Sequence, residues 1–259
     1  MSAWAAIEIA TYIVAVAFGA FAIFRWRRRG ASIPAGLGVS IDRGTVADLG
    51  MGLLITTAAM IGIFSLELAA GGIRSTGAPF DPVALSQFGL ILAVAAFVDE
   101  FVMRGMLVSG LALLLGGRAL TAVLISAVLF GMTHMMNPGA SALSVVSNSL
   151  GGVIYGLAFI RTRRIWLGLG LHFAWNFVQG PILGFPVSGH LMGGVLRVVE
   201  IGPGWLTGGA YGPEAGAVGI AFRFIIIAAV IAWTKSAHRA SACPMHTAPI
   251  ATATQAAKR

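Results

Sequence analysis

The stretch AAFVDEFVMRGMLVSGL, residues 95–111, places two carboxylates and an arginine in an otherwise apolar run. Asp99, Glu100 and Arg104 lie there among Ala, Phe, Val, Met, Leu and Gly. On insertion scales, an ionised side chain near the centre of a bilayer costs about 2.5–3.5 kcal/mol. These three charges therefore need partners or water, and the fold has to supply them.

The composition is that of an integral membrane protein. Of the 259 residues, 58% are hydrophobic and only 10% are charged, and the mean hydropathy is +0.89. Soluble domains carry about 25% charged residues. Apolar runs of about 20 residues, the length that crosses a bilayer, recur along the chain. We therefore expect an all-α, polytopic bundle of membrane-spanning helices embedded in the lipid bilayer.

The apolar runs predict about seven transmembrane helices around an internal polar cavity. They cover residues 4–24, 49–70, 84–115, 119–136, 141–160, 165–180 and 215–234. The third run is longer than a bilayer requires, so we expect it to tilt, break or project into water. The Gly- and Pro-rich connection 180–214 is expected to form a re-entrant or interfacial loop that lines a cavity.

We expect one integral-membrane domain over residues 1–235, followed by a polar and disordered tail over residues 236–259. The net charge of +8 comes from short basic clusters between the apolar runs. By the positive-inside rule these clusters mark the cytoplasmic side, which puts the N-terminus outside and the C-terminus in the cytoplasm. The Ala-, Gly- and Arg-rich composition favours a bacterial inner membrane. No nucleic-acid-binding module is visible, so no such partner is expected.

The three charges of the opening stretch point in two directions on a helix. Glu100 and Arg104 are four residues apart, so a helix stacks them on one face, where they can pair. Asp99 points about 100° away, toward a different neighbour. Taken alone, these residues also fit a structural ion pair that holds the third span in the bundle.

Two further motifs place imidazole and amide groups in other spans. FGMTH has Phe130 and His134 four residues apart, and HFAWN has His172 and Asn176 at the same spacing. Each alone also fits a structural histidine or a hydrogen bond between helices. Around one cavity, however, an acid and an imidazole can take a proton from water, and a second imidazole and an amide can donate to an oxyanion. These are the parts of a site that hydrolyses peptide bonds.

The three motifs resemble those of the CPBP family of intramembrane proteases, named for CAAX processing and bacteriocin processing (the Abi or Rce1-like group). DEFVMRG resembles the family's EExxxR motif, FGMTH its FxxxH motif and HFAWN its HxxxN motif, in the same order. The resemblance covers about residues 80–235 and includes the stretch GGAYGPEAG. It implies an intramembrane endopeptidase of the glutamic type that cleaves membrane-associated or prenylated-type peptides and needs no cofactor.

The resemblance also implies roles for six positions. Asp99 and His134 would activate the attacking water. Glu100 and Arg104 would hold the geometry of the site. His172 and Asn176 would form the oxyanion hole. Two histidines and two acids could also supply zinc ligands, so zinc stays open, although no HExxH motif is present. The single cysteine, Cys243, excludes a Cys-based metal cluster. The expected partner is a peptide or protein substrate in or near the membrane, and the oligomeric state is not predicted.

The chain departs from the family pattern at Asp99, where the family usually has glutamate. Aspartate is one methylene shorter, and a catalytic group misplaced by about 1 Å can cost about 10²-fold in rate. A second hypothesis is therefore a catalytically weak or inactive relative that binds a peptide or lipid partner in a maturation or immunity role. A third hypothesis is a proton-coupled carrier. Inverted repeats would support it, and the sequence shows none.

Overall fold

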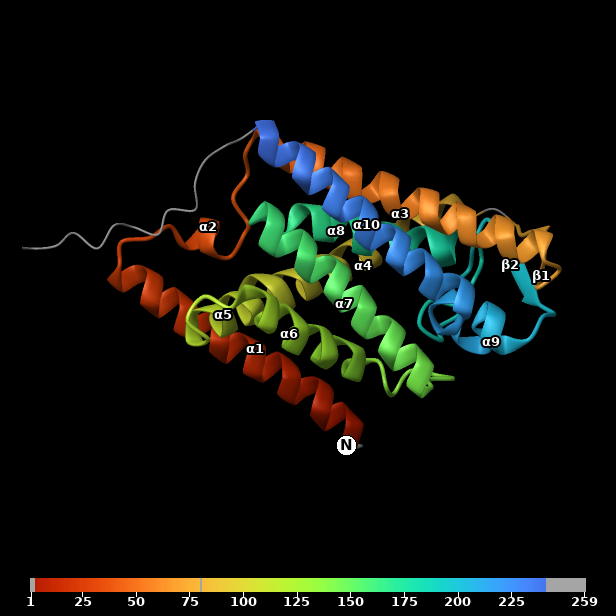
Figure 1. Ribbon diagram of the computed structural model, residues 1–259. Helices are drawn as coiled ribbons and strands as arrows, with labels where there is room; N and C mark the ends of the chain where they lie inside the picture. The colour runs from red at the N-terminus through yellow and green to blue at the C-terminus, as the bar shows by residue number, and fades with distance from the viewer. Residues whose placement is uncertain (1–2, 80, 241–259) are drawn as a thin grey trace, which may run out of the picture.

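The computed structural model describes residues 3–79 and 81–240, which form a bundle of long helices with a small sheet at one end (Figure 1). The main helices are α1 (Ala3–Arg28), α3 (Arg43–Ala69), α4 (Pro82–Asp99), α6 (Ala119–Thr133), α7 (Ala142–Thr162), α8 (Trp166–Phe177) and α10 (Ala217–Ala240). A short helix, α2 (Ile33–Gly36), links the first two. Helix α10 runs five residues into the predicted polar tail, and the rest of that tail lies outside the described residues.

Each predicted span coincides with a helical segment. Among the described residues, four helices are long and apolar enough to cross a membrane: Glu8–Arg28, Arg43–Ala69, Ala142–Thr162 and Ala217–Ser236. The helix Ala119–Thr133 is apolar but shorter. These helices support an integral membrane protein, while the count of seven spans stays a prediction.

The long third span changes its winding where its charges begin. Helix α4 starts at the N-cap Asp81, whose carboxylate accepts hydrogen bonds from the next turn, and ends at Asp99. The chain then continues as a π-helix, η1 (Glu100–Val108), and closes with α5 (Ser109–Leu114). Such wider turns often occur at functional sites. The expected break is therefore a π-helical section, with the two acids at its start and Arg104 in its middle.

A two-stranded sheet is the part of the fold that the all-α expectation misses. Strand β1 (Ile73–Gly77) pairs antiparallel with β2 (Leu196–Glu200), and the register runs from Ile73 opposite Glu200 to Gly77 opposite Leu196. The sheet ties the connection 180–214 to the chain that follows α3. That connection also contains short helical turns: the end of η2 (Val178–Ile182), then α9 (Gly204–Thr207), η3 (Gly209–Tyr211) and the start of η4 (Pro213–Ala215).

Helices α3 and α8 touch through glycines. A Cβ atom added at Gly52 would meet the backbone of Leu167 and Leu171 on α8. One added at Gly170 would meet the backbone of Leu49 on α3. Small residues let membrane helices approach this closely. This contact holds α8, which carries the HFAWN motif, against the longest helix of the bundle.

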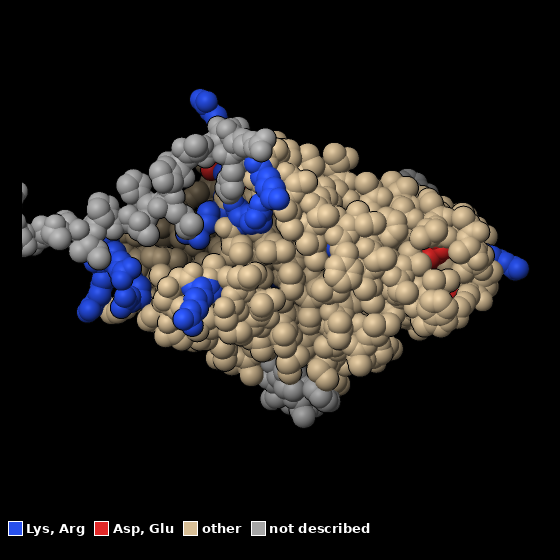
Figure 2. Space-filling model, viewed as in Figure 1, with Lys and Arg blue, Asp and Glu red and all other residues tan. Residues whose placement is uncertain are grey.

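Basic side chains gather at one end of the bundle, around the end of α1, the start of α3, the α7–α8 turn and the end of α10 (Figure 2). Among the described basic residues, Arg74 and Arg197 lie at the opposite end, on the sheet. This asymmetry is the one that the positive-inside rule uses. The orientation itself stays a prediction.

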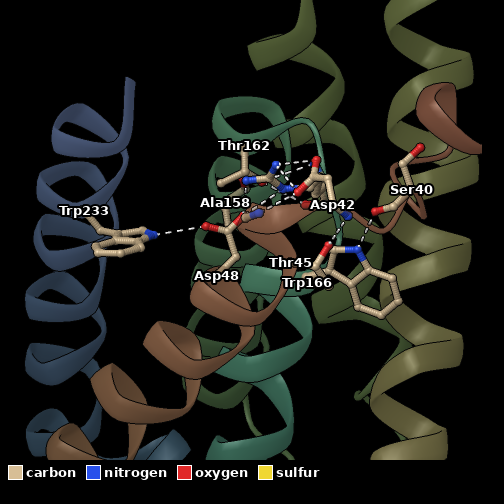
Figure 3. A network of polar contacts seen from close by, with 10 residues as sticks. Ser40, Asp42, Thr45, Asp48, Ala158, Thr162, Trp166 and Trp233 are labelled. Atoms are coloured by element: carbon tan, nitrogen blue, oxygen red, sulfur yellow. Dashed lines mark hydrogen bonds and ion pairs between the residues drawn. The ribbon is translucent and has the colours of Figure 1, made fainter. Parts of the chain in front are cut away.

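At the basic end, a network of polar contacts links the α7–α8 turn to α3 and α10 (Figure 3). The Arg164 guanidinium of this turn donates to both oxygens of Asp42, the N-cap of α3, at 2.9 and 2.8 Å, and to Asp48 on α3 at 2.9 and 2.7 Å. Trp233 of α10 donates to the other oxygen of Asp48 at 3.2 Å. Although slight burial acts in the opposite direction, the Gly44 backbone N–H and the Arg164 guanidinium hold the pKa of Asp42 below its ordinary value.

Replacing Asp42→Asn should lower stability only where the carboxylate is ionised. Asparagine can still cap α3, so the change mainly removes the charge that faces Arg164. Because the folded-state pKa is depressed, its stabilisation is present above the unfolded value of about 3.9 and is lost as pH falls through the folded value. Half exposure limits the effect to at most about 1 kcal/mol. Melting in detergent should show a gap from the wild type at pH 7 that narrows as the pH falls below about 4, and a gap independent of pH would contradict this account.

Replacing either of two glycines on α3 with alanine should change the stability of the protein in opposite directions. Alanine is favoured over glycine in helices by about 1 kcal/mol, so Gly50→Ala, which meets open space, should be neutral or stabilising. Gly52→Ala instead pushes Cβ into the α8 backbone and should destabilise by about 1–3 kcal/mol. Thermal unfolding of both variants in one detergent measures the difference. Equal melting temperatures would mean that α3 and α8 are not in direct backbone contact.

Candidate functional site

A pocket of about 150 Å³ lies where the ends of α4 and α6 meet α8. Its wall includes Asp99, His134, His172 and Asn176, which are four of the six residues singled out by the sequence. The other residues that line it are Phe130, Asn148, Tyr155, Trp175, Val187, Ser188, His190, Met192, Glu214 and Arg223. An acid, two imidazoles and an amide from separate segments thus share one space, to which the connection 180–214 also contributes.

The remaining two predicted residues, Glu100 and Arg104, are fully buried next to this pocket. The Arg104 Nη1 atom lies 3.2 Å from Glu100 Oε1, and the same oxygen lies 3.0 Å from His172 Nδ1. Arg104 also donates to the backbone oxygen of Gly152 at 3.3 Å. Glycine at position 168 leaves room for the carboxylate, because a Cβ there would lie 2.8 Å from Glu100 Oε2. The predicted ion pair therefore exists, and it reaches the histidine of the third motif.

The contact with Glu100 orients the His172 ring. An ionised carboxylate can only accept a hydrogen bond, so Nδ1 carries the proton that faces it. This leaves Nε2 as the ring nitrogen that is available to the pocket.

His134 is oriented by its own helix. Helix α6 ends at Thr133, and the His134 Nδ1 atom lies 2.8 Å from the backbone oxygen of Phe130. A carbonyl only accepts, so Nδ1 is the donor in this bond and Nε2 keeps its lone pair. His134 follows the last residue of α6 and lines the pocket there. A simple diagram of seven parallel spans would instead place it at a different depth from Asp99 and His172.

Aromatic rings fix both imidazoles and cover the arginine. Tyr155 stacks on His172, with centroids 4.7 Å apart and planes at 12°, and Phe130 meets the same ring edge-on at 5.8 Å. Phe130 also packs on His134 at 4.8 Å. The guanidinium carbon of Arg104 lies 4.8 Å from the Phe130 ring centre and 5.1 Å from that of Tyr155. The phenylalanine of FGMTH therefore contacts both histidines and the buried cation.

The wall formed by Glu214 and Arg223 was not predicted as part of the site. Buried Glu214 accepts hydrogen bonds from Trp175 Nε1 at 2.9 Å and from the backbone and hydroxyl of Ser188 at 2.6 and 3.1 Å. Arg223 of α10 lies over the Trp175 ring at 4.2 Å and donates to Asn148 at 3.3 Å. The available signals were an ionisable residue in the last predicted span, Arg223, and the acid of GGAYGPEAG, Glu214.

The phenol of Tyr211 contacts this wall through Asn148. The Asn148 amide donates to the Tyr211 hydroxyl at 2.7 Å. Burial, and then the nearby Glu214 carboxylate, raise the pKa of Tyr211 to about 12. The phenol therefore stays protonated over the physiological range and acts as a neutral hydrogen-bonding group.

A metal centre does not emerge from the described residues: no three of their His, Cys, Asp or Glu side chains come together in a way that could hold an ion. Asp99 forms a hydrogen bond with a residue of α1. Its Oδ1 atom accepts a hydrogen bond from the hydroxyl of Tyr12 on α1.

Removing one charge of the buried pair should destabilise the protein strongly. Glu100→Gln leaves the Arg104 guanidinium without its counterion, at an expected cost of about 3–5 kcal/mol. Replacing both residues, Glu100→Gln with Arg104→Met, should recover part of this loss because no uncompensated charge remains. Asp81→Asn makes the same chemical change at an exposed helix cap and should have little effect. The account fails if Glu100→Gln and Asp81→Asn melt alike in detergent.

Comparison with known proteins bears on the segment that carries the motifs. Residues 81–178 match the family model described as "Type II CAAX prenyl endopeptidase Rce1-like". The matched segment begins at the N-cap of α4 and contains all three motifs, whereas α1, α3 and α10 lie outside it. Searches of curated proteins and of solved structures return no significant match. The resemblance expected from the motifs is thereby confirmed for residues 81–178, which are similar to the Rce1-like family of type II CAAX prenyl endopeptidases.

Proposed function

We propose that this protein is an intramembrane endopeptidase that hydrolyses peptide bonds of membrane-associated peptides, with water activated by Asp99 and His134. The observation that carries the proposal is that these two residues share one pocket with His172 and Asn176. The family match over residues 81–178 supports the same class of activity. Prenylated-type peptides are the substrates that the family description suggests.

In the proposed first step, water binds between the Asp99 carboxylate and the His134 ring. His134 can act as the proton acceptor because its Nδ1 atom is engaged by the Phe130 carbonyl, which leaves the Nε2 lone pair free. The water oxygen adds to the peptide carbonyl carbon as its proton passes to the base. The tetrahedral intermediate then collapses, the C–N bond breaks, and the imidazolium gives that proton to the leaving amine, which leaves a carboxyl group on the other product.

The oxyanion formed in this step would be stabilised from α8. His172 and Asn176 are one turn apart on this helix and both line the pocket. The Asn176 amide can donate directly, and His172 can donate from Nε2 when its ring is protonated. The carboxylate of Glu100 balances that ring charge, and Arg104 in turn balances the carboxylate. The buried pair thus supports the oxyanion hole rather than the water.

The proposed location follows from the two ends of the bundle. The pocket is bounded by residues 187–192 of the connection that carries strand β2, and this strand lies at the end opposite the basic side chains (Figures 1 and 2). With the basic end in the cytoplasm, the N-terminus lies outside and cleavage takes place toward the outer side of a bacterial inner membrane.

The proposed water-activating pair can be tested by removal. Asp99→Asn and His134→Ala should each lower kcat by about 10²–10⁴-fold, since each removes a group that handles the proton. Asn176→Ala should lower kcat by about 10²–10³-fold through loss of an oxyanion donor. The measurement uses purified protein in proteoliposomes, internally quenched membrane peptides with and without a prenylated CaaX end, and mass spectrometry of the products.

Two controls make the same chemical changes elsewhere: Asp81→Asn at the exposed cap of α4 and His246→Ala in the C-terminal tail. Both should keep the wild-type rate. The proposal is wrong if any cleavage seen with the wild type is equally fast in Asp99→Asn and His134→Ala. A folded wild type that cleaves none of these peptides would favour the alternative of a protein that only binds its partner.

A further inference from the structure

The Asp99 carboxylate is held by a residue from outside the matched segment. Tyr12 of α1, 87 residues earlier in the chain, donates its hydroxyl proton to Asp99 Oδ1. Asp99 lines the pocket, whereas Tyr12 does not. The phenol therefore contacts the carboxylate from behind, as seen from the space where a substrate would bind. One oxygen of the carboxylate is engaged in this way.

Close packing of α1 against the π-helix and α5 fixes this contact. A Cβ atom at Gly110 of α5 would meet the backbone oxygen of Phe18 on α1. A Cβ atom at Gly19 of α1 would meet the side chain of Met106 in η1. Ala15 on the same face is fully buried. Contacts between backbones and small residues leave α1 little freedom to slide, so the position of the phenol relative to Asp99 is set by the helix packing.

We propose that Tyr12 is a positioning residue for Asp99 in the hydrolysis proposed above, on which this inference rests. The short aspartate side chain stands where the family usually has glutamate, and the phenol fixes its rotamer so that the second carboxylate oxygen faces the water. A hydrogen bond donated to a carboxylate also favours its ionised form, which is the form that a base requires. Helix α1 is then a functional part of the site.

Several charged or titratable groups surround the two partners. Glu8 lies one turn before Tyr12 on α1, and both Glu8 and Arg104 are within electrostatic range of the phenol. His134 is within range of Asp99 from the end of α6. These groups add their own titrations to a pH–rate profile, so the test below compares profiles that differ only at position 12.

The first experiment is Tyr12→Phe, assayed with the quenched peptide that the wild type cleaves. We expect kcat to fall about tenfold with KM within about twofold, since the base is misplaced while the substrate contacts remain. The acid limb of the kcat profile should move up by about half to one pH unit, because the ionised carboxylate has lost a donor. Ile13→Val, at a neighbouring exposed position on α1, is the matched control and should change neither quantity.

The second experiment changes the strength of the donor without changing the fold. Replacing Tyr12 with 3-fluorotyrosine makes the phenol more acidic and a stronger donor, so the acid limb should move down, opposite to Tyr12→Phe. Because this replacement is almost isosteric, it keeps the inference testable even where Tyr12→Phe lowers expression or the melting temperature.

A third measurement tests whether the effects of changes at Tyr12 and at Asp99 on kcat depend on each other. Asp99→Glu adds a methylene toward the Tyr12 hydroxyl and should lower kcat about tenfold. Tyr12→Phe removes the phenol oxygen and leaves a space about the size of that methylene. In this background, Asp99→Glu should therefore lower kcat by less than about threefold. Such non-additivity is expected for residues in contact.

The outcomes separate the inference from the proposal beneath it. If the wild type does not cleave, or if Asp99→Asn cleaves equally well, the proposed function fails and the inference fails with it. If cleavage requires Asp99 but both changes at Tyr12 leave kcat and the pH profile at wild-type values, only the inference is overturned. Additive effects of Asp99→Glu and Tyr12→Phe, within about twofold, would also overturn it.

Discussion

One buried charge interaction organises this structure. A single oxygen of Glu100 lies 3.2 Å from the Arg104 guanidinium and 3.0 Å from the His172 ring, and both charged side chains are removed from solvent. A buried pair is tolerated only when its geometry is good and its polar atoms have partners. The neighbouring features meet part of that demand: glycine at position 168 makes room, a backbone oxygen accepts from the arginine, and two aromatic rings cover it. Among the described residues, Glu100 Oε2 and Arg104 Nε find no hydrogen-bond partner.

Much of this arrangement follows from spacing in the sequence. Glu100 and Arg104 pair as the four-residue interval predicts, and the helices lie where the apolar runs indicate. The pairing of β1 with β2 was out of reach, because more than a hundred residues separate the strands and neither shows a strong alternating pattern. The wall containing Glu214 and Arg223 was missed for a related reason: only tertiary packing shows that both residues contact Trp175.

The site extends beyond the segment that identifies the family. Residues 81–178 hold the three motifs, yet Arg223 reaches the pocket from α10 and Tyr12 reaches Asp99 from α1. Helix α3, also outside the match, supports α8 through Gly52. The motif-bearing helices thus depend on neighbours outside the matched segment, which contribute two polar side chains and one close backbone contact.

The π-helical section has a consequence for how the third span faces its surroundings. Its wider turns rotate every later side chain relative to an ordinary helix, so the apolar stripe of α4 and that of α5 are out of phase. Leu90, Ile91 and Val94 before the junction are exposed on the outer surface, whereas the run from Val102 to Gly105 after it is buried. A helical wheel drawn with one constant period through residues 82–114 therefore misplaces the residues that follow the junction. The π-helical section itself is buried or half-buried at every position, so it enters the core around its whole circumference.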